Sequence, residues 1–281
     1  MNESKKYIFW IDLVRVICVI CMMWIVFIWH LKDYLPVEYQ MFGSVLKVSQ
    51  WITITALFAF TLLSGYSMAK YKFQSFKDVL SFYKKRLIRF YPLYLVAILC
   101  FWWFGWYSSV TVIKCMTGIA LFFNEAPLTL WYMCMLMFFY MITPIINWKY
   151  GSYKINVAIY IFVILLFGLL SKLDVTHGNM ALYTPAYMAG LFMGKNINLQ
   201  SVDFSSFWAK AIKVLAYSSF CIYLFHRIIF VIVANMYNHT WVVDKVLIQM
   251  DISCAVIVVV CTCVLTYGIQ FAYDLCVRKC M

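Results

Sequence analysis

The chain has 281 residues, of which 65% are hydrophobic and only 12% are charged, with a formal net charge of +12. Soluble domains have about 45–50% apolar and about 25% charged residues, so this composition excludes an ordinary soluble protein. The apolar residues form long unbroken runs rather than short alternating segments, which predicts an all-α, polytopic integral membrane helical bundle. The positive charge lies in the connecting loops and at the ends, which favours membrane lipid as a partner and excludes nucleic acid.

Eight apolar segments are predicted to span the membrane, and the range compatible with the pattern is eight to ten. The first is too long for a signal-peptide core and lacks a small-residue cleavage site, so an uncleaved first helix is expected. In chain order the segments are residues 7–29, 44–68, 89–107, 130–148, 155–170, 180–193, 207–236 and 248–277.

Residues 110–123 are apolar, but this run is too short to span and predicts a short re-entrant or interfacial helix. No linker or internal repeat divides the chain, so residues 1–281 are expected to form a single transmembrane domain. The eleven cysteines lie mostly inside apolar segments and are expected to act as small packing residues. No Cys/His spacing is typical of a zinc site, so no metal is predicted.

Residues 82–92 are predicted to form a cationic hinge between two apolar segments. Basic residues in short loops stay on the cytoplasmic side, so the hinge is expected in the cytoplasm. With eight spans, the loop charges then place both termini in the cytoplasm of a multi-pass protein of the cell (inner) membrane. The cluster is either a topology signal that also attracts anionic lipid, or an anion-binding site. Its members are Lys84, Lys85, Arg86 and Arg89.

Four ionisable residues stand out because charges are costly inside spans and usually face a partner or a cavity. Arg15 follows Asp12 by one helical turn, so the two could form an ion pair, or Arg15 could reach the interface. His30 lies near the outer end of the same segment, and His226, followed by Arg227, lies within a later one. The histidines could share a polar pocket, or could make only interfacial and interhelical contacts.

Several motifs occur in a fixed order along the chain, and together they resemble the membrane-bound acyltransferase 3 family. Members of that family O-acylate sugars of cell-surface polysaccharides, usually with acetyl groups from cytoplasmic acetyl-CoA, and the resemblance extends over nearly the whole chain. The motifs are Ile11-Asp-Leu-Val-Arg15…His30, Phe60-Thr-Leu-Leu-Ser-Gly65, Phe82-Tyr-Lys-Lys-Arg-Leu-Ile-Arg-Phe-Tyr-Pro92, Leu130-Trp-Tyr, Tyr140…Pro144 and Tyr217-Ser-Ser-Phe-Cys-Ile-Tyr-Leu-Phe-His226.

The chain departs from the family pattern in two places. The pattern has a histidine eleven residues after the first-helix arginine, but Val26 occupies that position and His30 follows one turn later. The segment between Trp148 and Met180 is also short and has room for one helix where the family has more.

The resemblance assigns catalytic roles to His30, His226 and Arg15. Transfer of an acyl group to a sugar hydroxyl needs a base, and histidine suits that task. His30 is the predicted base, and His226 is either the alternative base or the group that orients it. Arg15 would stabilise the charge that develops on the carbonyl oxygen, and Arg227 could also do so or contact the substrate.

The same resemblance assigns binding roles along the rest of the chain. Lys84, Lys85, Arg86 and Arg89 would hold the phosphates of acyl-CoA. Ser64 and Gly65 would allow a close backbone approach to the donor, or would serve only tight helix packing. Trp131 and Tyr132 would bind the acceptor sugar, although an interfacial aromatic belt explains such residues equally well.

These expectations predict an integral membrane O-acyltransferase that needs no metal. The acyl donor would be acetyl-CoA, and the acceptor would be a polysaccharide or a lipid-linked sugar. Two alternatives are a non-enzymatic polysaccharide exporter or transport accessory protein, and a small structural membrane subunit.

Overall fold

The computed structural model of the protein describes residues 9–32, 42–123, 125–148, 153–197, 207–237 and 252–280. These residues form nine α-helices and one short 3-10 helix, and their one β contact is an isolated bridge between Phe73 and Trp148, which confirms the all-α prediction. The helices are α1 (Phe9–Lys32), α2 (Phe42–Met68), α3 (Phe76–Trp103), α4 (Ser109–Met116), η1 (Ala120–Phe123), α5 (Trp131–Ile146), α6 (Tyr153–Lys172), α7 (Gly178–Asn196), α8 (Phe207–Tyr237) and α9 (Ile252–Cys280).

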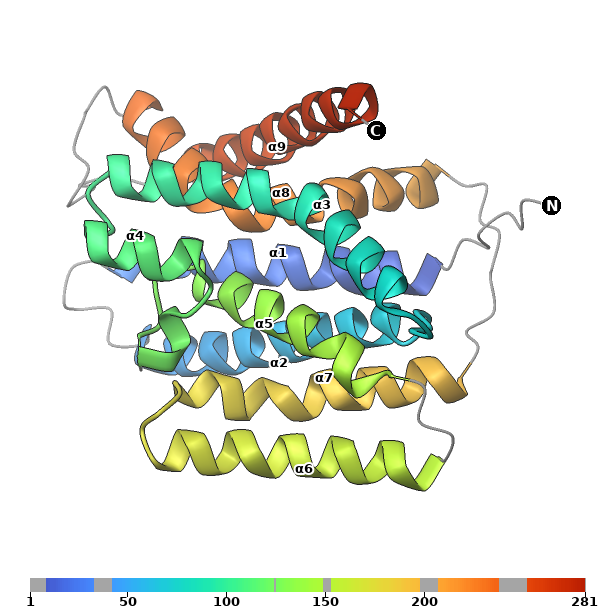
Figure 1. The fold of residues 1–281 in the computed structure, drawn as a ribbon. Helices are drawn as coiled ribbons and strands as arrows, with labels where there is room; N and C mark the ends of the chain where they lie inside the picture. Colours follow the sequence, from blue (N-terminus) through green and yellow to red (C-terminus); the bar gives the residue numbers. More distant parts are fainter. Residues whose placement is uncertain are drawn as a thin grey trace. The chain divides into compact units, whose positions relative to one another are not determined.

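The chain divides into two compact units. The central unit, Phe58–Asn198, contains the C-terminal part of α2 and all of α3 to α7 (Figure 1). The terminal unit combines Met1–Leu57 with Leu199–Met281, and in it α8 packs against both α1 and α9.

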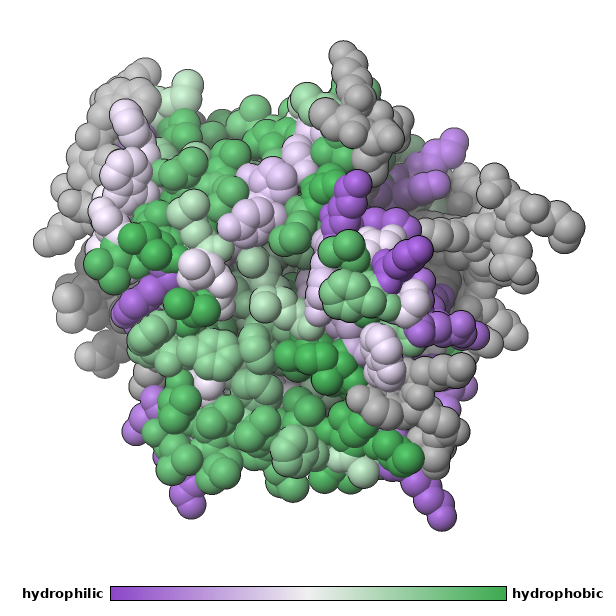
Figure 2. Space-filling model, viewed as in Figure 1, coloured by the Kyte–Doolittle hydropathy of each residue, from purple (hydrophilic) through white to green (hydrophobic). Residues whose placement is uncertain are grey.

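Five helices of the described chain are long and apolar enough to cross a membrane, and α5 is a shorter apolar helix. Several of their large apolar side chains are exposed; on α6, Phe162 and Leu165 are 63% and 66% exposed. Figure 2 shows this pattern for α6, which is hydrophobic along its length and hydrophilic at its two ends. Exposed apolar surface of this kind is stable when lipid, rather than water, surrounds it. The five stretches are Gln50–Met68, Phe76–Trp103, Lys154–Lys172, Phe207–Val233 and Val256–Val277.

The prediction of a cationic hinge at residues 82–92, with a span that starts at residue 89, is wrong. Helix α3 begins at Phe76 and runs without a break through the basic cluster, so that Pro92 lies in its interior rather than near its start. A capping box begins the helix: the Ser75 hydroxyl accepts from the Asp78 N–H, and the Asp78 carboxylate accepts from the Ser75 N–H at 2.9 Å. The basic residues that follow are good helix formers, so positive charge in this segment does not imply a loop.

The short apolar run at residues 110–123 forms two short helices instead of one. The first of them, α4, ends shortly before Gly118, whose φ is +74°, and η1 follows. Helix α4 extends for roughly 12 Å, far less than the ~30 Å of hydrocarbon that a spanning helix must cross. The expectation that this run does not form a spanning helix is therefore confirmed.

Glycines set a close crossing of α2 and α7 inside the central unit. A Cβ on Gly190 would lie 2.1 Å from the Leu62 carbonyl oxygen, and one on Gly65 would lie 2.2 Å from the Tyr187 carbonyl oxygen. Gly194, one turn beyond Gly190, meets Tyr66 in the same way. This small-residue spacing lets two helix backbones approach closely, as is common between membrane helices.

Candidate active site

One end of the central unit brings together residues that are far apart in the sequence. Helices α2, α5 and α7 end there and α3 begins there, on the right-hand side of Figure 1. The Tyr66 hydroxyl donates to the Ile197 carbonyl at 3.1 Å, which ties α2 to α7. The bridge between Phe73 and Trp148 joins the α2–α3 connection to the end of α5.

Arg86 is the only charged residue on the buried face of α3. The buried positions of that helix, such as Val79, Phe82, Phe90 and Leu93, recur every three or four residues, and Arg86 falls within this pattern. Its side chain is half-buried. The other three predicted anion ligands, Lys84, Lys85 and Arg89, are exposed.

Aromatic rings surround the Arg86 guanidinium. Its Nη2 donates a 2.8 Å hydrogen bond to the Tyr71 hydroxyl, and its Cζ lies 5.2 Å from the centroid of the Tyr71 ring. The rings of Phe82 and Tyr140 both lie 5.6 Å away, at distances typical of cation–π contacts. We call Arg86, Tyr71, Phe82 and Tyr140 the arginine cage.

No carboxylate neutralises the arginine cage within the described chain. The ion pairs found there join Arg15 to Asp12 and Lys114 to Glu125. A half-buried guanidinium that is surrounded by aromatic rings and donates one hydrogen bond to a phenol retains N–H donors for an anionic ligand. Arg89 lies three residues further along α3, close enough on the helix surface to share such an anion.

Tyr140 connects the arginine cage to Ser64. Its hydroxyl donates to the Ser64 Oγ at 3.5 Å, and its ring packs 5.4 Å from that of Phe90. Gly65, in contrast, packs against the α7 backbone, which agrees with the packing alternative for this residue. Tyr71 and Tyr140 were not among the predicted site residues, although Tyr140 belongs to the motif Tyr140…Pro144.

Trp131 and Tyr132 lie at the opposite end of α5, roughly 13 Å from Tyr140 along the helix axis. Tyr132 is fully buried, and its hydroxyl shares a 3.0 Å hydrogen bond with Thr61 Oγ1, so it is part of the core. Trp131 is half-buried, with its ring 5.7 Å from that of Tyr183. Their proposed contact with a sugar stays a prediction.

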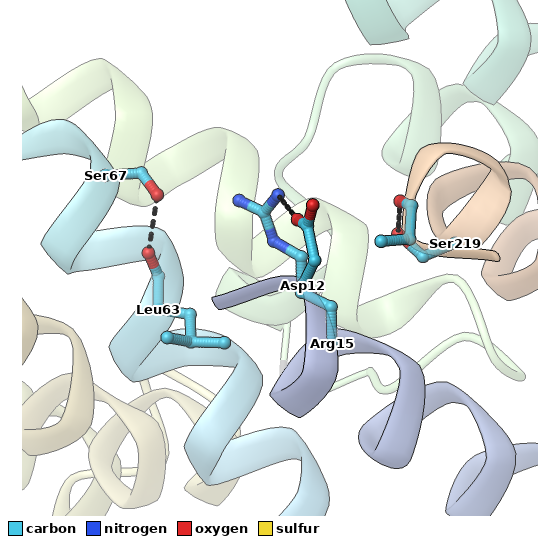
Figure 3. A network of polar contacts seen from close by, with 6 residues as sticks. Asp12, Arg15, Leu63, Ser67 and Ser219 are labelled. Carbon is cyan, nitrogen blue, oxygen red and sulfur yellow. Dashed lines mark hydrogen bonds and ion pairs between the residues drawn. The ribbon is translucent and has the colours of Figure 1, made fainter. Parts of the chain in front are cut away.

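In the terminal unit, Arg15 and Asp12 form the ion pair that the sequence left open. Arg15 Nη1 lies 3.4 Å from the Asp12 Oδ1, and Figure 3 shows the guanidinium directed at the carboxylate.

Figure 3 also draws Ser67 and Ser219, whose hydroxyls donate to carbonyls of the preceding turn in their own helices. Such bonds satisfy a hydroxyl locally and indicate a structural role for the two serines.

His226 is buried in α8, with 5% of its surface exposed. Its Nδ1 lies 3.0 Å from the Ile222 carbonyl oxygen and 2.8 Å from that of Tyr223. Since carbonyl oxygens only accept hydrogen bonds, Nδ1 carries the proton of the neutral ring. Nε2 is then the unprotonated nitrogen, which is the tautomer that a general base needs.

Two further predicted residues, Arg227 and His30, belong to the terminal unit. Arg227 is half-buried next to His226. His30 lies in α1, but its side chain falls outside the described part of the structure.

A family model described as an acyltransferase domain, that of acyltransferase 3, matches residues 8–209. This match extends over more than half of the chain. The chain belongs to the membrane-bound acyltransferase 3 family. No curated protein and no solved structure matches it.

As a member of the acyltransferase 3 family, the protein is a membrane acyltransferase. The matched residues include Arg15, His30 and the whole arginine cage. They do not include His226 or Arg227, so the match is less extensive than the motifs predict. The role of His226 therefore depends on its geometry and not on the family match.

Proposed function

We propose that this membrane acyltransferase moves an acetyl group from cytoplasmic acetyl-CoA to a hydroxyl of a cell-surface or lipid-linked polysaccharide sugar. The observation that carries the proposal is the arginine cage, a half-buried guanidinium with no carboxylate partner in the described chain. Coenzyme A presents several phosphate groups, and guanidinium and ammonium groups are their usual partners.

Binding of the donor would begin at the basic cluster of α3. Arg86 and Arg89 would hold phosphate oxygens, while the exposed Lys84 and Lys85 would attract the anion from the cytoplasmic side. The Tyr140 hydroxyl, which reaches Ser64, offers a further polar contact beside the guanidinium.

The chemical step requires a base, because a sugar hydroxyl is a weak nucleophile. A histidine would take the hydroxyl proton as the oxygen attacks the thioester carbonyl. The carbon–sulfur bond then breaks, the acetyl ester forms, and coenzyme A leaves as the thiol after it takes up the proton. His30 is the base that the family pattern favours, and His226 has the required tautomer. Arg15 would stabilise the oxyanion.

The experiment is an assay of labelled acetyl transfer by the purified protein in nanodiscs, with profiling of the cell-surface glycan in parallel. His30→Ala and His226→Ala are tested singly, with His177→Asn as a histidine control outside the proposed machinery. Loss of the base is expected to lower the rate about 100-fold or more. The control should retain its activity.

Two outcomes would contradict the proposal. Acetyl transfer that survives both alanine substitutions would exclude these histidines as the base. Loss of polysaccharide export without any change in acetylation would instead support the exporter alternative.

A further inference from the structure

Asn147 is a buried amide that lacks a hydrogen-bond partner among the described residues. It follows the last turn of α5, and its backbone N–H donates to the Thr143 carbonyl at 2.8 Å. The side chain is 7% exposed, and neither Oδ1 nor Nδ2 is hydrogen-bonded within the described chain. Burial of an amide without a hydrogen-bond partner costs free energy, and a ligand that bonds to the amide would remove this cost.

Asn147 lies at the same end of the central unit as the arginine cage. Its neighbour Trp148 forms the backbone bridge to Phe73. The Phe73 ring lies 5.2 Å from that of Phe82, and Phe82 belongs to the cage. Tyr71, two residues before Phe73, accepts the hydrogen bond from Arg86. Asn147 is thus connected to the Arg86 guanidinium through the bridge between Trp148 and Phe73, and from there through either Phe82 or Tyr71.

The position of Asn147 along α5 indicates which part of the donor it would meet. It lies roughly 10 Å beyond Tyr140 along the helix axis, towards the end of the unit. In the proposed function the pantetheine arm would extend from the phosphates away from this end of the central unit, and the nucleotide would stay at it. A ligand with its phosphates at Arg86 would therefore bring its nucleotide, and not its thioester, to Asn147.

The chemistry of the amide matches an adenine base. A carboxamide offers one acceptor and one donor side by side, and the edge of adenine presents the complementary amino group and ring nitrogen. A phosphate has no donor for the amide oxygen. Trp148, which is 39% exposed, adds an aromatic surface on which a base can stack.

We propose that Asn147, together with Trp148, binds the adenine base of the acyl-CoA donor and makes the enzyme selective for an adenine nucleotide. The inference rests on the proposed function, in which acyl-CoA is the donor. It adds a specificity-determining residue on α5 to the phosphate ligands of α3.

The test compares the binding of two ligands to the purified full-length protein by calorimetric titration. One is coenzyme A, and the other is 1,N6-etheno-coenzyme A, in which the hydrogen-bonding edge of adenine is blocked but all phosphates remain. The wild type is expected to bind coenzyme A about tenfold more tightly. Asn147→Leu, which keeps the volume, should bind both ligands with the weaker affinity.

Two variants serve as controls. Arg86→Ala should weaken the binding of both ligands equally and keep the ratio of their affinities, because it removes a phosphate contact and leaves the base contact in place. Asn147→Ser provides a second, smaller replacement if the leucine variant fails to fold, as judged by its thermal midpoint.

The outcomes separate this inference from the proposed function. Equal affinity of the wild type for the two ligands, or an unchanged preference in the Asn147 variants, would overturn the adenine site and leave acyl-CoA as the donor. No binding of coenzyme A by the wild type would instead contradict the proposed function.

Discussion

Arg86 differs from its three cationic neighbours because of its place on the helix. Lys84, Lys85 and Arg89 are exposed and are screened by water and salt. Arg86 falls on the buried stripe of α3, where aromatic rings replace much of its hydration. A partly desolvated cation interacts more strongly with an anion than an exposed one does. The sequence identified the cluster, but the structure distinguishes its members.

We therefore predict unequal effects for two substitutions in this cluster. Arg86→Ala should weaken the binding of coenzyme A about tenfold to 100-fold, as expected for a lost charge-assisted contact. Lys84→Ala, the matched control on the same helix, should change it less than about threefold, because exposed charges contribute little. Arg86→Lys should restore only part of the affinity, since an ammonium cannot bind two oxygens in the manner of a guanidinium.

Calorimetric titration at two salt concentrations would measure these effects. Equal losses for the alanine variants of Arg86 and Lys84 would contradict the special role of the buried arginine.

His177 gives a second prediction at the residue scale. It is the N-cap of α7, where its Nδ1 accepts the Asn179 N–H at 3.2 Å. Burial lowers the pKa of His177 below its usual value of 6.5. The neutral ring is thus favoured in the folded state, and the stability that it contributes is present above pH 6.5 and is lost as the pH falls through the lowered pKa. A protonated ring could no longer accept this bond and would place a positive charge at a helix N-terminus.

The measurement is the thermal midpoint of the purified protein between pH 8 and pH 5, for the wild type and for His177→Asn. Asparagine caps helices without titrating, so the variant should lose less stability than the wild type below pH 6.5. Parallel curves for the two proteins would show that the cap does not titrate in this range. The comparison between variants also removes the contribution of the other three histidines.

At the scale of elements, apolar length and periodicity predicted the helices well, but not all of their ends. Each of the eight apolar segments overlaps a helix in the described chain, because a long apolar run in lipid satisfies its backbone hydrogen bonds by forming a helix. The predicted beginning of α3 is wrong because the capping box at Ser75 and Asp78, and not the basic cluster, sets where this helix begins. The break at Gly118 depends on one residue with positive φ, which the sequence does not reveal.

The glycine crossing of α2 and α7 leads to a prediction about stability. Gly190→Ala would bring a Cβ to within 2.1 Å of a backbone carbonyl, so the helices would have to separate. A cost of about 1–3 kcal/mol is expected for this overpacking. Gly168→Ala on α6 is the matched control, because nothing lies within 4 Å of its Cβ position and alanine is the better helix former.

Thermal midpoints of the two variants in the same detergent would test this crossing. The Gly190 variant should unfold at a lower temperature, and the Gly168 variant should match or exceed the wild type. A Gly190 variant as stable as the wild type would contradict the close approach of the two helices.

For the whole molecule, the charge distribution of the central unit predicts its orientation in the membrane. The end that contains the arginine cage also carries Lys70, Lys72 and Lys77, all three exposed and without an acidic ion-pair partner in the described chain. At the other end, Lys114 is paired with Glu125, and Lys172 lies close in sequence to Asp174. The cage should therefore face the cytoplasm.

Short epitope tags would test this orientation. A tag after Lys72 should bind antibody only in permeabilised cells, whereas a tag after Asp174 should bind it in intact cells. The reverse pattern would contradict both the orientation and the cytoplasmic source of the donor.

The sequence by itself determined that the chain is an all-α membrane protein of the acyltransferase 3 family, with a basic cluster and with histidines inside two of its apolar segments. These properties depend on composition, on the lengths of the apolar segments and on the order of short motifs, all of which can be read from the sequence. Only the tertiary structure decided that Arg86, and not its neighbours, faces the core, that Tyr71 and Tyr140 surround it, and that Asn147 lies buried at the same end of the central unit. Helices distant in sequence supply these groups, so their meeting depends on how the helices pack, and no local pattern encodes it.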